Sequence, residues 1–143
     1  MAAQGLTPRE QQLVHQHLDA AGAKLFWQQN VADQRHAFAV ASRVATTLPG
    51  DDDAHTAALL HDVGKRLTSL GVIRRSIATV FDGIGIPLTA TMRLYRTHGW
   101  VGAADLSAAG FDGIVVSFAA NHPGPAPEGI DEDRWAALLD ADG

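Results

Sequence analysis

Apolar residues recur along most of the chain at the spacing of an α-helix. In the N-terminal segment they follow one another at intervals of four, three and four residues: Val14, Leu18, Ala21 and Leu25. This spacing places them on one face of a helix. Thr7 and Pro8, ahead of this stripe, supply an N-cap residue and a proline at the first helical position. We therefore expect one amphipathic N-terminal helix within residues 1–30.

The same periodicity predicts further helices over residues 33–48, 51–64, 73–84, 89–95, 101–108, 111–121 and 133–140. Taken alone, the apolar run at residues 111–121 also fits a buried strand, but no other segment alternates polar and apolar residues to pair with it. Prolines at 123, 125 and 127 predict an extended loop after this run. We expect an all-α, single-domain helical bundle over residues 1–143, with residues 1–30 packed on a core of residues 31–143.

Composition and charge narrow the classes of protein that fit this pattern. A chain of 143 residues is long enough to bury one core, and 16 acidic against 11 basic side chains give a net charge of −5. This charge argues against nucleic-acid or anionic-membrane partners. The N-terminus lacks a signal-peptide pattern, and no apolar run approaches the roughly 20 residues that span a bilayer. We expect a cytoplasmic protein without a membrane or nucleic-acid partner.

The candidate metal ligands of this chain are histidines and aspartates. The chain has no cysteine, so a metal would have to bind imidazole, carboxylate or water. The candidate ligands are separated by 25, 37, 24 and 20 residues around one adjacent pair: His36, His61, Asp62, His98, His122 and Asp142. Each gap fits about one helix and a connection, so each helix could bring one ligand to a shared point. A buried Asp62 without a partner or a metal would be costly.

These residues also resemble a known family. The segment Leu59-Leu60-His61-Asp62-Val63-Gly64-Lys65 is similar to the signature of the HD superfamily of metal-dependent phosphohydrolases. Arg35-His36 resembles the position of the family's first histidine, and Leu138-Leu139-Asp140-Ala141-Asp142 resembles its closing pattern. Thr97-His98-Gly99 and Asn121-His122-Pro123 fit the subgroup that carries a second metal, as in bacterial dinucleoside-polyphosphate hydrolases. The resemblance runs from about residue 31 to the C-terminus.

The resemblance implies an HD-type helical bundle with a buried site for two divalent transition-metal ions. It implies that the first ion is bound by His36, His61, Asp62 and Asp142. Asp62 would bridge to a second ion, which His98 and His122 also bind. Nitrogen and oxygen ligands suit iron, manganese, cobalt and zinc alike. Two carboxylates leave a cationic pocket around two such ions, which favours phosphate, and a hydroxide bridging the ions would attack phosphorus.

The function implied is cleavage of a phosphoester or phosphoanhydride bond in a small phosphorylated molecule, with nucleotides the first class to consider. Asp62 and Lys65 are the expected catalytic residues, and Lys65 and Arg35 are expected to contact substrate phosphate. On a continued helix Lys65 would share the face of His61. Each cation also has an ordinary explanation: the helix dipole favours lysine at a helix C-terminus, and arginine is common on a solvated helix face.

Two other functions fit the same residues. HD-fold mixed-valent di-iron oxygenases share the set of four histidines and two aspartates, so the ligands alone do not separate hydrolysis from oxidation. A non-catalytic HD module that binds a nucleotide or a protein partner is the third possibility, although such a scaffold would need none of the six ligands. The segment after His122 lacks the Gly-Tyr-Pro motif of cyclic-dinucleotide phosphodiesterases, so cyclic dinucleotides are less favoured substrates.

Two further questions are which aspartate is the last ligand and whether the other histidines belong to the site. Asp140 lies two residues before Asp142 and could be the last ligand instead, but the Ala-Asp pattern favours Asp142. Three further histidines are expected to take no part in the site. His15 and His17 flank the apolar stripe and should face solvent or its margin, and His55 lies off the helical face of His61.

Overall fold

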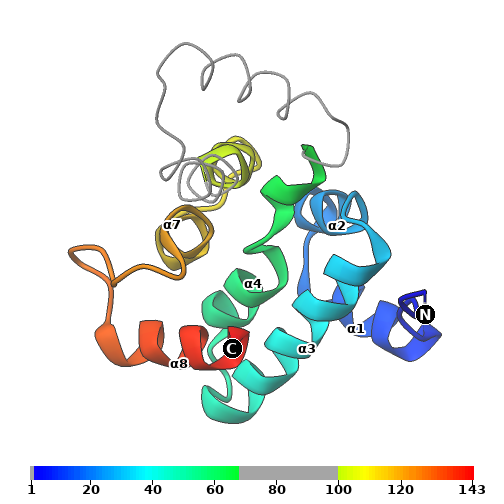
Figure 1. The fold of residues 1–143 in the computed structure, drawn as a ribbon, viewed down its shortest axis with the longest axis horizontal. Coiled ribbons are helices and arrows are strands. Elements are labelled where there is room, and N and C mark those ends of the chain that lie inside the picture. The colour runs from blue at the N-terminus through cyan, green and yellow to red at the C-terminus, as the bar shows by residue number, and fades with distance from the viewer. Residues whose placement is uncertain (1, 68–99) are drawn as a thin grey trace.

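The computed structural model describes residues 2–67 and 100–143, and every regular element in this part of the chain is a helix (Figure 1). The elements are α1 (Pro8–His17), α2 (Ala20–Trp27), α3 (Val31–Thr47), α4 (Asp52–Leu60), the 3-10 helix η1 (Val63–Leu67), α7 (Gly113–Asn121) and α8 (Glu132–Asp142). Residues 100–108 are also helical. No strand occurs in these ranges, which confirms the all-α prediction. The helices predicted over residues 73–84 and 89–95 lie outside the described residues, as does His98.

The central element is α4, which packs against α2, α3, α7 and α8. The side chains of its four consecutive residues Ala57, Ala58, Leu59 and Leu60 are all fully buried. Because consecutive residues point to different sides of a helix, this pattern requires neighbours all around α4. Asp51 caps the helix by accepting a hydrogen bond from the Ala54 amide, and two more aspartates occupy the first turn. The helix predicted from residue 51 therefore does begin there, and its acidic residues lie at the positive end of the helix dipole.

The N-terminal region forms two helices rather than the single helix that its apolar stripe predicted. The chain leaves the helical conformation at Leu18, whose φ and ψ are −98° and 142°. Asp19 then accepts a hydrogen bond of 2.8 Å from the amide of Gly22 and caps α2. A short polar side chain that binds nearby backbone in this way competes with helix continuation. The stripe correctly identified the buried residues Val14 and Leu18 but not the break between the helices.

The last helix, α8, packs against α3 and α4. Arg134, near the start of α8, forms two bonds of 2.7 and 2.8 Å with Asp51 at the start of α4. At their other ends Asp142 of α8 lies next to His61, the residue that follows α4. The C-terminal end of α8 therefore lies next to α3 and the end of α4 (Figure 1).

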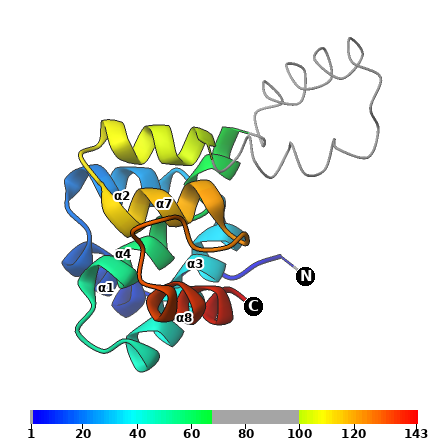
Figure 2. The same ribbon diagram turned by 90° about the vertical axis from the view of Figure 1, so that its left-hand side faces the viewer.

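The helix of residues 100–108 lies at the opposite end of the molecule from α8 (Figure 2). A Cβ atom at Gly102 would come within 3.0 Å of the backbone nitrogen of Gly64, so this helix crosses the chain just after Asp62 in close contact. No described helix is both long and apolar enough to cross a membrane.

Candidate metal centre

His61 and Asp62 lie where α4 ends and the chain turns into η1. Leu60 is the last residue of α4, and His61 keeps helical φ and ψ values of −62° and −29°. Both residues are buried, with exposed fractions of 2% for His61 and 4% for Asp62. The neighbours that bury them come from α3, α7 and α8, so residues distant in the sequence surround this turn.

Imidazole nitrogens and carboxylate oxygens from four segments converge here. His61 Nε2 lies 3.2 Å from Asp142 Oδ1 and 3.3 Å from Asp62 Oδ2. His36 Nε2 lies 2.9 Å from Asp142 Oδ1, and His122 Nε2 lies 3.5 Å from Asp62 Oδ1. Within each of two overlapping trios, His36–His61–Asp62 and His61–His122–Asp142, one potential ligand atom from each residue lies within 4.8 Å of the others. We call these five residues the His/Asp cluster.

Two of the imidazoles are oriented by backbone carbonyls. His61 Nδ1 lies 2.7 Å from the carbonyl oxygen of Ala58, and His122 Nδ1 lies 2.6 Å from that of Phe118. A carbonyl accepts only, so Nδ1 carries the proton and donates in both residues. Nε2 then turns toward the carboxylates. Metal-binding histidines are commonly fixed by this kind of hydrogen bond on the second nitrogen.

The environment of His61 Nε2 requires a positive charge. This buried atom has no hydrogen-bond partner of suitable geometry, yet two carboxylate oxygens face it. A bare lone pair would repel them, so a proton or a metal cation must lie between them. Burial opposes protonation, but Asp142 and Asp62 outweigh it and raise the pKa of His61 to about 9. His61 in turn lowers the pKa of Asp142 to about 2, against the effect of burial.

The carboxylate of Asp62 is held ionised. Burial raises its pKa, but contacts with His122, His61 and Lys65 outweigh burial and bring the pKa far below its ordinary value of 3.8. An ionised carboxylate that is 4% exposed is a strong ligand for a divalent cation. The donor set of the His/Asp cluster, nitrogen and oxygen only, fits iron, manganese, cobalt or zinc.

One side of the His/Asp cluster is open to solvent. The side chain of His61 is fully buried, whereas those of His36 and Asp142 are 41% and 22% exposed. A small molecule could therefore approach from the side of α3 and the C-terminal end of α8, while α4 and α7 close the other side.

Lys65 lies at the edge of the cluster. Its ammonium nitrogen is 2.7 Å from Asp62 Oδ2. Burial disfavours the charged form, but Asp62 outweighs this and raises the pKa of Lys65, so the side chain remains a cation. The helix predicted over residues 51–64 ends earlier, at Leu60, and the 3-10 helix η1 follows it. The tighter 3-10 turn brings Lys65 to Asp62.

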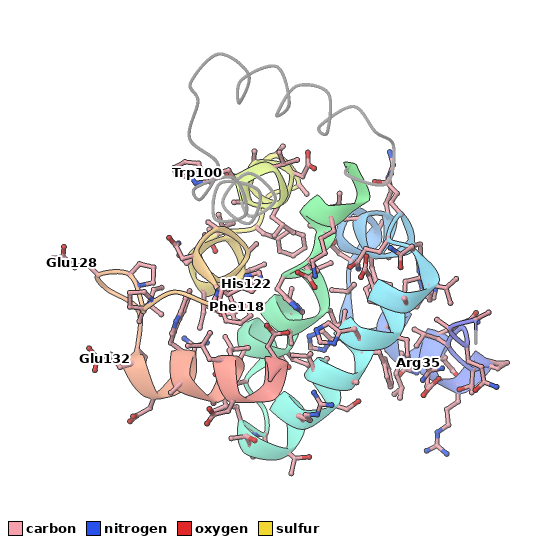
Figure 3. The ribbon with its side chains drawn as sticks, viewed as in Figure 1. Arg35, Trp100, Phe118, His122, Glu128 and Glu132 are labelled. Atoms are coloured by element: carbon pink, nitrogen blue, oxygen red, sulfur yellow. The ribbon has the colours of Figure 1, made fainter. Side chains whose placement is uncertain are left out.

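Arg35 does not face the cluster, which corrects the expectation that it contacts substrate. Its Nη1 lies 2.8 Å from Glu10 Oε1, and its other nitrogens donate to the carbonyls of Gln4 and Gly5. Figure 3 shows Arg35 on the side of the molecule that carries α1, away from His122. Adjacent residues on a helix point about 100° apart, so His36 can face the cluster while Arg35 anchors the N-terminal segment.

The choice between the two C-terminal aspartates follows from the same geometry. Asp142 contacts His36 and His61, whereas Asp140 is exposed.

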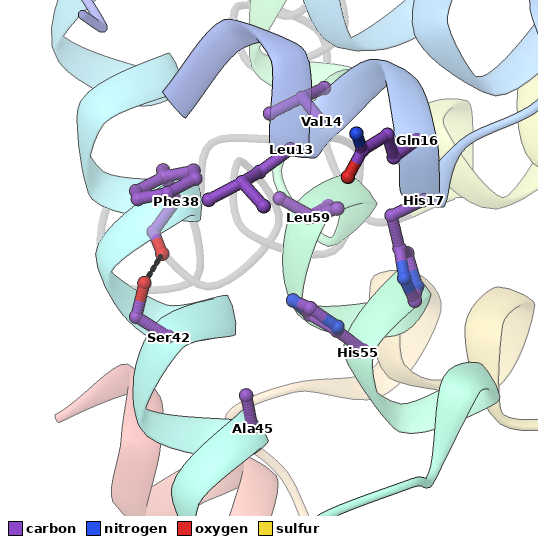
Figure 4. Close-up of a pocket in the computed structure, with 9 residues that line it drawn as sticks. All are labelled: Leu13, Val14, Gln16, His17, Phe38, Ser42, Ala45, His55 and Leu59. Carbon is purple, nitrogen blue, oxygen red and sulfur yellow. Dashed lines mark hydrogen bonds between the residues drawn. The ribbon is translucent and has the colours of Figure 1, made fainter. Parts of the chain in front are cut away.

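Of the three histidines expected to lie elsewhere, His15 is exposed, and the other two lie together, with ring centres 4.0 Å apart: His17 and His55. They line a separate cavity of about 430 Å³ between α1, α3 and α4 (Figure 4).

Sequence reasoning did not identify the groups that orient the ligands. These are the carbonyls of Ala58 and Phe118, together with the ring of Phe118. This ring stacks on that of His122, with ring centres 4.9 Å apart and an angle of 26° between the ring planes. Phe118 lies four residues before His122, one helical turn away, so the spacing could have indicated the contact. A backbone carbonyl, by contrast, leaves no mark in the sequence.

Comparison of the chain with protein-family models, with curated proteins and with solved structures found no match. The resemblance to the HD superfamily is therefore carried by the residues of this chain alone.

Proposed function

We propose that this protein is an HD-type, metal-dependent phosphohydrolase that cleaves a phosphoester or phosphoanhydride bond of a small molecule, with nucleotides as the first substrate class to test. One observation carries the proposal. His61 Nε2 is buried against the carboxylates of Asp62 and Asp142 while its Nδ1 is held by the Ala58 carbonyl. A divalent metal cation suits this arrangement better than a proton, because its two positive charges neutralise both carboxylates at once.

In this proposal a first cation is bound by His36, His61, Asp62 and Asp142, and a second by Asp62 and His122. The resemblance to the HD superfamily also assigns His98, which lies outside the described residues, to the second set. Bound divalent cations would act as Lewis acids toward a phosphoryl oxygen and would lower the pKa of water near them.

The chain itself supplies positioning and charge. Lys65 is a cation at the edge of the His/Asp cluster, and its ammonium can move from Asp62 to a substrate phosphate that approaches from the open side. Asp62, 4% exposed, and Phe118, fully buried, exclude bulk water from the inner side of the cluster. Charge interactions at the site are stronger for that reason.

Activity against a panel of phosphorylated compounds tests the proposal. The purified chain, loaded in turn with Mn²⁺, Fe²⁺, Co²⁺ or Zn²⁺, is incubated with nucleoside mono-, di- and triphosphates and dinucleoside polyphosphates, and phosphate and nucleotide products are measured. We expect turnover with at least one metal, a loss of at least about 100-fold in Asp62→Asn, and wild-type turnover in His15→Gln, which removes an exposed histidine outside the cluster.

Two outcomes would contradict this function. Oxygen consumption by the iron-loaded chain without phosphate release would favour the oxygenase reading. Metal binding without turnover of any compound in the panel would favour a binding module.

A further inference from the structure

The C-terminal turn of α8, which carries Asp142, is attached to α3 at two points. His36 Nε2 lies 2.9 Å from Asp142 Oδ1. Seven residues further along α3, Arg43 donates a hydrogen bond of 2.7 Å from Nη1 to the main-chain carbonyl of Ala141. Seven residues make about two helical turns, so His36 and Arg43 lie on the same face of α3. One bond holds the side chain of Asp142 and the other holds the backbone just before it.

The bond from Arg43 satisfies a group that the helix cannot satisfy itself. The last carbonyls of an α-helix have no partner within the helix, and a positive charge near them is favoured by the helix dipole. Ala141 packs its side chain into the core with an exposed fraction of 4%, and the Gly143 amide donates to the Leu139 carbonyl at 3.1 Å. Arg43 is itself an exposed residue, so packing alone does not explain where its guanidinium lies.

We propose that Arg43 is a positioning residue for metal binding: by holding the Ala141 carbonyl it keeps the Asp142 carboxylate at ligand distance from His36 and His61. This inference rests on the proposed function, because it takes Asp142 to be a ligand. The apparent affinity of a site falls in proportion to the fraction of molecules in which the site is assembled. A last turn of α8 that frays would therefore weaken metal binding although no ligand has been removed.

Titration of the full, metal-free chain with Co²⁺, followed by visible absorption, measures this effect directly. Arg43→Gln should raise the Kd for Co²⁺ by about three- to tenfold, the effect of one charge-assisted bond at a helix end. Arg43→Lys retains a cation and a donor at the same place and should recover most of the affinity. Arg9→Gln removes an exposed arginine from α1 and should leave the Kd unchanged.

A second comparison separates positioning from a general structural role. In an Asp142→Asn background, Arg43→Gln should no longer change the Kd, because the residue through which it acts is gone. The backbone amides of residues 140–143 should also exchange hydrogen faster in metal-free Arg43→Gln than in the metal-free wild type.

The possible failures are distinguishable. A Kd that is the same in Arg43→Gln and wild type overturns the inference and leaves the metal site in place. An equal effect of Arg43→Gln with and without Asp142 also overturns it. Absence of Co²⁺ binding by the wild-type chain overturns the metal site itself, and with it both the proposed function and this inference.

Discussion

At the scale of single residues, His61 concentrates the unusual chemistry of this protein. Its Nδ1 is committed to the Ala58 carbonyl and its Nε2 faces two carboxylates without a hydrogen bond. In a metal-free molecule a proton must take the place between them, which is why the pKa of His61 is raised to about 9 from its ordinary 6.5. The same atom is a ligand only when that proton has left. Protons and metal therefore compete for one nitrogen.

This competition predicts proton release when the metal binds. At pH 7.5, below the raised pKa of about 9, His61 is protonated in the metal-free chain, so binding of one Zn²⁺ should release about one proton from it. Calorimetric titrations in buffers of different ionisation enthalpy measure this number. His15→Gln should release the same number of protons as the wild type, and binding without proton release would contradict the protonated state of His61.

The same shift sets the pH dependence of the metal-free fold. Because the folded pKa of His61 lies above the unfolded value of 6.5, the stabilisation from its contacts with Asp62 and Asp142 is complete below pH 6.5. It is lost as the pH rises through about 9, where His61 gives up its proton in the folded state as well.

At the scale of elements, the contacts of α8 with both α3 and α4 determine where Asp142 lies. The bidentate contact of Arg134 with Asp51 joins the starts of the two helices, and the His/Asp cluster joins their ends. Asp51 also caps α4 through the Ala54 amide, so one carboxylate serves both the helix and the helix pair. The spacing of residues along each helix then places Asp142 opposite His61.

We expect that removing the cation of the Arg134–Asp51 ion pair lowers the stability of the fold in a pH-dependent way. Arg134 lowers the pKa of Asp51 below its ordinary 3.8, so the contribution of the pair is present above about pH 4 and is lost as the pH falls further. Arg134→Gln should reduce the free energy of unfolding by about 0.5–1 kcal/mol at pH 7, the range for a partly exposed ion pair.

Urea denaturation at pH 7 and at about pH 2.5 measures both conditions, and the difference between Arg134→Gln and wild type should be smaller at the lower pH. Arg9→Gln, which alters an exposed arginine elsewhere, is the matched control. A difference of the same size at both pH values would show that packing rather than charge joins α4 to α8.

At the scale of the whole molecule, the His/Asp cluster ties together segments that are far apart in the sequence. His36 comes from α3, His61 and Asp62 follow α4, His122 follows α7, and Asp142 ends α8. The residues of α4 are buried on all sides and form part of the core. The His/Asp cluster joins α3, α7 and α8 to the C-terminal end of α4. A cation bound there would hold four parts of the fold in place at once.

Metal binding should therefore stabilise the folded protein. At a free Zn²⁺ concentration of about 100 times the Kd, the free energy of unfolding should rise by roughly 3 kcal/mol and the Tm by roughly 10 °C. Thermal melts followed by circular dichroism, with Zn²⁺ and with EDTA, measure the shift. His122→Asn should reduce it and His15→Asn should preserve it, whereas an equal Tm with Zn²⁺ and with EDTA in the wild type would contradict the metal centre.

Local patterns in the amino-acid sequence were enough to predict the all-α fold class and to select the candidate ligands. Helical periodicity and capping residues act over a few positions, so α3, α4, α7 and α8 could be predicted within a few residues of their bounds. The break at Leu18 was missed because the apolar stripe continues across it, while the cap at Asp19 depends on a single side chain. Residue type and spacing also selected His36, His61, Asp62, His122 and Asp142.

The direction in which each of these side chains points depends on how the helices pack, and local sequence does not predict it. Arg35 and His36 are neighbours in the sequence, yet one binds the N-terminal segment and the other faces Asp142. The sequence pattern favoured Asp142 over Asp140, and in the structure Asp142 contacts His36 and His61 whereas Asp140 is exposed. The carbonyls that orient His61 and His122, and the bond from Arg43, join atoms whose proximity depends on packed helices rather than on any local pattern.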